Sequence, residues 1–155
     1  MGKEESEFVK ELKHKARRHS IKEGIFASGK SAFGDHYISP FAIAINASNS
    51  MVALLASISG LLGPLSQIFS SRLMEKYSRK KIVMRAVFLE SLIWLPLILL
   101  AFLFYKGILT ETLPILFLVI YTIYVILINI STPPWFSRMG DVVDSEYRGR
   151  WFSER

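Results

Sequence analysis

The sequence has no cysteine and only three histidines, and both features restrict its chemistry. Without cysteine the chain has no disulfide, thiolate nucleophile or cysteine-ligated zinc or iron–sulfur centre. His14, His19 and His36 form no H-x-x-x-H pair, so a zincin-type metal motif is also missing. We therefore expect no metal site.

Charged residues are missing from three long stretches. Residues 46–71, 91–105 and 112–132 contain no Asp, Glu, Lys or Arg, and 51% of the chain is hydrophobic. The 91–105 stretch extends back through Glu90 to about Ile82. Roughly 18 to 20 apolar residues suffice for a helix to cross a hydrocarbon core of about 30 Å. The composition therefore predicts an all-α integral membrane protein.

The positive charge, a formal +6, is grouped along the chain. Basic residues precede or open the segment 21–45, lie between residues 72 and 85, and follow residue 132, whereas the other connections carry only Lys106. Because Lys and Arg mark the cytoplasmic face, this pattern points to a membrane rather than to nucleic acid. It predicts four transmembrane helices, with a cytoplasmic N-terminus. The predicted spans are about 21–45, 49–71, 82–105 and 113–132, with a basic arm at 1–20 and cytoplasmic loops at 72–81 and 133–155.

A loop motif lies between the second and third predicted spans. Residues 71–83, SRLMEKYSRKKIV, resemble the cytoplasmic motif G-x-L-a-D-R-x-G-R-K/R of the major facilitator superfamily (MFS), a family of secondary transporters. Glu75 stands where the family has Asp, Lys76 where it has Arg, and serines replace both glycines. A second element, R-G-R, is similar to the family's approach to its fifth helix. The matching residues are Leu73, Glu75, Lys76, Arg79, Lys80, Arg148 and Arg150.

This resemblance covers about residues 20–155 and implies the first four helices of a twelve-helix transporter. In such proteins two halves rock around a central cavity. Residues 21–155 would then be a partial N-terminal domain in the plasma membrane, completed by the remaining helices of the full-length protein. In the family the motif's acid and cations hold the outward-facing state, so the resemblance implies a cytoplasmic gate at the matching residues.

Several polar residues fall within the spans, where a charge costs about 2.5 to 3.5 kcal/mol on insertion scales. On a continuous helix Asp35 shares a stripe with serines, whereas Lys30 lies on another face and could pair with Glu90 or a bound anion. Asp35 could instead reach water at the outer interface, Glu90 could form a structural ion pair, and His36 could be structural. The candidates for substrate binding or proton coupling are Asp35, Lys30, His36, Glu90 and Gln67.

Small residues mark one side of the second span. They recur at steps of three and four, which predicts a face for close helix packing with Gln67 as its polar member. The predicted stripe is Ala56, Gly60, Pro64, Gln67 and Ser71, with Gly63 beside it. Gln67 is its one possible contact with a cavity.

Residues 24–31, GIFASGKS, match the phosphate-loop pattern G-x-x-x-x-G-K-[ST]. A basic polar arm precedes them rather than a buried strand, and no strand ending in an acid follows, so we expect no ATP binding. The leading hypothesis is secondary active transport of a small solute by alternating access, coupled to a proton. Under this hypothesis we expect no enzyme activity, no catalytic residue and no cofactor. The alternative is a four-helix membrane scaffold or assembly subunit that transports nothing.

Overall fold

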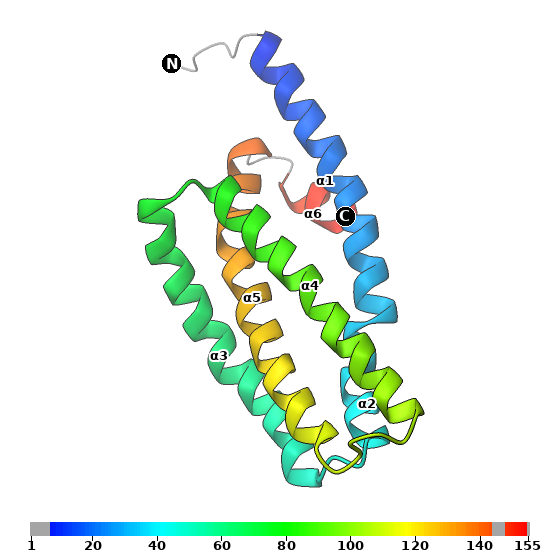
Figure 1. The fold of residues 1–155 in the computed structure, drawn as a ribbon. Coiled ribbons are helices and arrows are strands. Elements are labelled where there is room, and N and C mark those ends of the chain that lie inside the picture. The colour runs from blue at the N-terminus through cyan, green and yellow to red at the C-terminus, as the bar shows by residue number, and fades with distance from the viewer. Residues whose placement is uncertain (1–6, 144–147, 155) are drawn as a thin grey trace. The chain divides into compact units, whose positions relative to one another are not determined.

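The computed structural model describes residues 7–143 and 148–154, and these ranges contain helices and no strand (Figure 1). The expected all-α class is therefore confirmed for the described part. Its elements are α1 (Glu7–Phe33), the 3-10 turn η1 (Asp35–Tyr37), α2 (Ile38–Ala44), α3 (Asn49–Lys76), α4 (Arg79–Tyr105), α5 (Leu113–Val142) and α6 (Arg148–Glu154).

Three of the described helices, α3, α4 and α5, are long and apolar enough to cross a membrane. The shortest has 27 residues, and at about 1.5 Å per residue it exceeds a hydrocarbon core of about 30 Å. This fits the expected multi-pass integral membrane protein.

The predicted span at 21–45 is not a continuous helix. α1 ends at Phe33, η1 follows, and α2 covers only the last part of the segment. Two residues explain the interruption: Gly34 is a poor helix former, and Pro40 has no N–H to donate to the carbonyl of His36. The prediction that residues 21–45 form one transmembrane helix is therefore wrong, whereas the other three predicted spans correspond to candidate membrane helices.

The chain divides into two compact units. Residues 37–136, called here the three-helix unit, hold α2, α3, α4 and most of α5; the other unit contains α1, the end of α5 and α6. Within the three-helix unit the long helices lie side by side in alternating directions (Figure 1). Only Tyr77 and Ser78 separate α3 from α4, whereas residues 106–112 join α4 to α5 at the opposite end.

Two helices end in the same type of turn. At the end of α4 the N–H of Ile108 donates to the Leu103 carbonyl at 3.0 Å, and Gly107 has a φ of 67°. At the end of α2, Asn46 takes the corresponding position with a φ of 61°. Glycine and asparagine tolerate this left-handed conformation, so both residues let the chain reverse at the helix end.

The apolar core of the three-helix unit lies toward the α4–α5 connection. It is formed by α2, the beginnings of α3 and α5, and the end of α4. The rings of Phe41 and Phe117 meet edge to face with centroids 5.3 Å apart. The buried members of this core are Ile38, Ala42, Ile45, Leu55, Leu97, Leu100, Leu113 and Phe117.

Candidate functional site

Polar contacts join α3 to α5 beyond the apolar core. Gln67 Nε2 donates to Asn129 Oδ1 at 2.9 Å, and Asn129 Nδ2 donates to the Val125 carbonyl at 2.8 Å. The hydroxyls of Ser59 and Tyr121 are hydrogen-bonded at 2.6 Å. Membrane helices associate through such hydrogen bonds and through small residues. The α3–α5 seam, as we name it, comprises Ser59, Gly63, Gln67 and Ser70 of α3 with Tyr121, Asn129 and Ile130 of α5.

Gly63 of α3 lies against the Asn129 side chain of α5. A Cβ at this position would meet the Asn129 side chain at 3.4 to 3.5 Å, whereas one at Gly60 would meet nothing within 4 Å. Of the predicted packing stripe, Ala56, Gly60, Pro64 and Ser71 are exposed, whereas Gln67 and the adjacent Gly63 belong to the contact face.

Two adjacent prolines interrupt the backbone ladder of α5. In an α-helix the N–H of residue 134 would donate to the carbonyl of Ile130. Pro134 has no N–H, so that carbonyl loses its usual backbone donor. Ser70 supplies the missing donor: its Oγ donates to the Ile130 carbonyl at 2.6 Å, and Ser70 is fully buried. A hydroxyl from a neighbouring helix therefore satisfies a backbone group that the proline leaves free.

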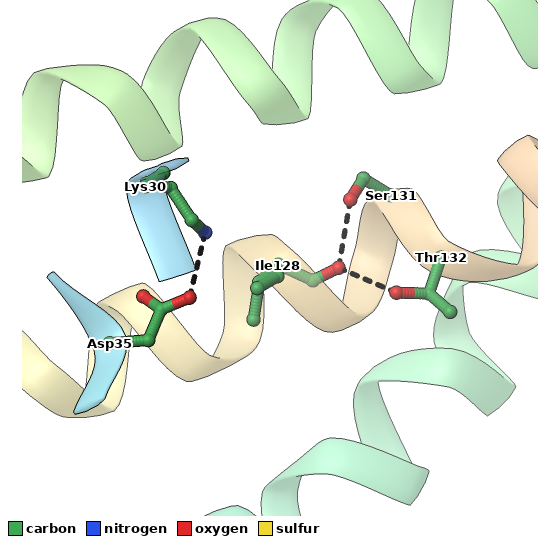
Figure 2. A network of polar contacts seen from close by, with 5 residues as sticks. All are labelled: Lys30, Asp35, Ile128, Ser131 and Thr132. Carbon is green, nitrogen blue, oxygen red and sulfur yellow. Dashed lines mark hydrogen bonds and ion pairs between the residues drawn. The ribbon is translucent and has the colours of Figure 1, made fainter. Parts of the chain in front are cut away.

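Hydroxyl groups also reinforce α5 just before the prolines. Ser131 and Thr132 both donate to the carbonyl of Ile128, at 2.8 and 2.9 Å (Figure 2). Such back-bonding and prolines both tend to bend helices, and in α5 they fall within one turn of each other.

Glu90 lies on the inner face of α4. Its residue exposure is 7%, although α4 is otherwise apolar along most of its length. One turn later on the same face, the ring of Trp94 meets that of Tyr124 edge to face, with centroids 6.0 Å apart. Trp94 Nε1 is buried and has no hydrogen-bond partner within the described residues. A buried carboxylate and an indole N–H that has no partner in the described part of the chain are thus neighbours on one apolar helix.

Lys30 and Asp35 form an ion pair across the end of α1. Their Nζ and Oδ2 atoms are 3.4 Å apart, and their side chains are 31% and 27% exposed (Figure 2). On a continuous helix five residues correspond to about 140° of rotation, which would separate the two side chains. The expectation that they occupy different faces is therefore wrong, because the chain leaves the α-helix at Gly34 and turns through η1. His36, in the same turn, is exposed.

The residues of the loop motif lie where α3 meets α4. The predicted loop 72–81 is mostly helical, because α3 continues to Lys76 and α4 begins at Arg79. Glu75, Lys76, Arg79 and Lys80 are exposed, whereas Leu73 is half-buried. Their role as a gate stays a prediction.

The predicted gate also includes Arg148 and Arg150, and the structure describes the side chain of Arg148 alone. The Arg148 guanidinium donates to the carbonyls of Gly140 and Val143, at 2.6 and 3.1 Å. These carbonyls end α5, so this cation caps the negative end of a helix. Arg150 lies in α6, and its side chain is outside the described part of the structure.

Several residues of the α3–α5 seam, and the two aromatic residues near Glu90, were not predicted from the sequence. Asn129 was the easiest of them to identify from the sequence, because an amide within an uncharged apolar run requires a hydrogen-bond partner. Trp94 and Ser70 carried no such signal, since tryptophan and serine are common in apolar membrane helices. The overlooked residues are Ser59, Ser70, Trp94, Tyr121, Tyr124 and Asn129.

Comparisons with protein-family models, curated proteins and solved structures return no match to this chain. The resemblance to the major facilitator superfamily therefore rests on the motif residues alone.

Proposed function

We propose that the protein is a secondary active transporter that moves a small solute in exchange for, or together with, a proton. The observation that carries this proposal is the burial of Glu90 in an apolar, membrane-length helix. Ionisable residues are expensive at such positions and are typically retained for ion or substrate pathways. The neighbouring Trp94 indole N–H, buried and unsatisfied within the described residues, adds a donor that a solute can use.

The interrupted segment at 21–45 supports the same proposal. Transporters use broken helices where backbone and charged side chains line a site within the membrane. We propose that this segment forms a fourth, broken crossing, because that places the basic arm and the α3–α4 turn on the same cytoplasmic face. Asp35, Lys30, His36 and Gln67 stay candidates for coupling or substrate contact.

In this proposal the chain makes no covalent chemistry and uses neither ATP nor a cofactor. Its partners are the lipid bilayer, the transported solute and further helices that would complete an MFS-type cavity. The plasma membrane is the proposed location, with a cytoplasmic N-terminus.

The test is solute-driven proton movement in proteoliposomes that hold the full-length protein, with those further helices, and the pH dye pyranine. Panels of amino acids, sugars, nucleosides, organic cations and organic anions are added outside, and internal pH is recorded. We expect one class to drive proton flux, and Glu90→Gln to reduce it at least tenfold. Glu111→Gln is the matched control, because Glu111 is an exposed acid in the α4–α5 connection. Full flux in Glu90→Gln would remove Glu90 from the coupling role.

A membrane scaffold without transport is the second candidate, and the α3–α5 seam favours it. The polar side chains of Gln67 and Asn129 bond to each other, as do those of Ser59 and Tyr121, so they hold helices together. Absence of proton flux with every solute class, from protein that is folded and inserted, would leave this candidate ahead.

A further inference from the structure

The α3–α4 turn carries a dense group of cations. Six basic residues, from the last turns of α3 and the first turns of α4, are exposed around Tyr77 and Ser78, with Glu75 as the one acid in the stretch 72–85. We call this group the basic turn. It comprises Arg72, Lys76, Arg79, Lys80, Lys81 and Arg85.

Arg79 apart, the cations of the basic turn are not neutralised by the part of the protein that the structure describes. Apart from Arg79, none of its six side chains makes an ion pair or side-chain hydrogen bond within the described ranges 7–143 and 148–154. Three of the cations are consecutive in the first turn of α4, and this turn contains no acidic residue. Like charges repel there, and the helix dipole disfavours cations at that end. An external anion would relieve both effects.

The opposite end of the three-helix unit differs. Its one basic residue in residues 106–112 is Lys106, whose ammonium lies 5.7 Å and 5.9 Å from the ring centroids of Phe102 and Tyr105. These distances are within the range of cation–π contacts, so the aromatic rings partly satisfy this charge. The two ends are thus unequal both in the number of cations and in how they are satisfied.

The position of the basic turn identifies the kind of anion. Apolar side chains begin directly below it on the outside of α4, where Met84 is 61% and Phe88 is 62% exposed. Cations at the boundary between exposed apolar surface and water lie at the level of lipid headgroups. Clusters of four to eight Lys and Arg beside a membrane helix attract anionic lipids, and arginine matches phosphate with two parallel hydrogen bonds.

We propose that the basic turn is a binding site for the phosphate groups of anionic phospholipids. This inference does not depend on transport, because it requires only that α3 and α4 lie in a bilayer. Both are candidate membrane spans by length and composition.

The test uses the full chain reconstituted in phosphatidylcholine with traces of spin-labelled lipid. Electron paramagnetic resonance gives the association constant of labelled phosphatidylglycerol relative to labelled phosphatidylcholine. We expect at least a threefold preference for phosphatidylglycerol that falls toward one in 0.5 M salt, because screening shortens the reach of charges. Lys80→Gln and Lys81→Gln should each lower it, and the double variant should lower it further. Lys106→Gln should leave it unchanged.

Single and double variants are used because removing all six charges could invert the insertion of the helices. Equal preference in the wild type and in the Lys80→Gln/Lys81→Gln protein would overturn the proposal. So would a preference that disappears on neutralising Lys13, Lys15, Arg17 and Arg18 of α1 while the basic turn is intact. Loss of the preference in 10 mM inorganic phosphate, but not in chloride of equal ionic strength, would assign the site to a free anion instead.

Discussion

Toward the α4–α5 connection the three-helix unit is held by apolar packing, whereas beyond it the contacts between α3 and α5 are polar. The apolar core includes Leu55, Leu100 and Phe117, while the seam relies on Gln67 and Asn129. In a bilayer lipid tails are as apolar as leucine, so burying an apolar side chain gains chiefly close packing. The polar seam gains hydrogen bonds that lipid cannot replace. The core can therefore tolerate changes that preserve shape, whereas the seam requires particular partners.

The largest expected effect comes from emptying the core. Phe117→Ala removes a ring that is 2% exposed and packs edge to face on Phe41. Its cost should be about 3 kcal/mol, because the cavity forfeits contacts on every side. Unfolding of the reconstituted protein in mixed SDS micelles measures this cost. Phe88→Ala is the control, since Phe88 is 62% exposed and should change stability little. Equal losses in the two variants would show that no specific core exists.

A smaller effect is expected from crowding the seam. Gly63→Leu forces a branched side chain against Asn129, because a Cβ would already be in van der Waals contact with that side chain at 3.4 Å. We expect a loss of about 2 kcal/mol in the same assay, because α3 and α5 must separate. Gly60→Leu lies three residues earlier with open space around it and should be nearly neutral. If Gly60→Leu proved the more damaging, the helix face that contacts α5 would be the stripe first predicted from sequence.

Removing the hydroxyl that compensates Pro134 should cost still less. Ser70→Ala leaves the Ile130 carbonyl without the bond that Ser70 Oγ provides at 2.6 Å. An unsatisfied buried acceptor costs about 1 kcal/mol or somewhat more. Ser71→Ala is matched, because the Ser71 hydroxyl is exposed and bonds within its own helix to the Ile68 carbonyl. In the double variant Ser70→Ala/Pro134→Ala the loss should shrink, since a restored backbone N–H can donate to Ile130.

The sequence was most informative about where the apolar helices lie. The expected spans 49–71, 82–105 and 113–132 correspond to α3, α4 and α5, but α3 and α5 extend further at their C-terminal ends. The length of an uncharged stretch corresponds to the thickness of the hydrocarbon core. The helix itself can continue beyond that core into the headgroup region. Boundaries drawn from hydropathy are therefore too short.

The faces of these helices were harder to predict. α3 is apolar nearly all round, and small residues lie on two adjacent stripes, one with Gly60 and one with Gly63. Gly60 and Gly63 are three residues apart, so they lie only about 60° apart around the helix, and packing against α5 decides between the two stripes. The Lys30–Asp35 pair was missed for a related reason. A continuous helix would place the two side chains on different faces, whereas the chain leaves the helix between them. Gly34 and Pro40 together were the available warning.

The smallest expected effect, and the one most specific to the seam, is the coupling between Gln67 and Asn129. The single variants Gln67→Leu and Asn129→Leu each remove one side of a 2.9 Å hydrogen bond. Interhelical hydrogen bonds in membranes contribute about 0.6 kcal/mol on average and at most about 1.7 kcal/mol in double-mutant cycles. We therefore expect the stability loss of the double variant to be smaller than the sum of the two single losses, by about that average. Thr122, which bonds within α5 to the Leu118 carbonyl, provides the uncoupled partner for a control cycle with Gln67. A coupling near zero for Gln67 and Asn129 would mean that Gly63 and close packing hold this end of the unit as well, and the contrast between core and seam would disappear.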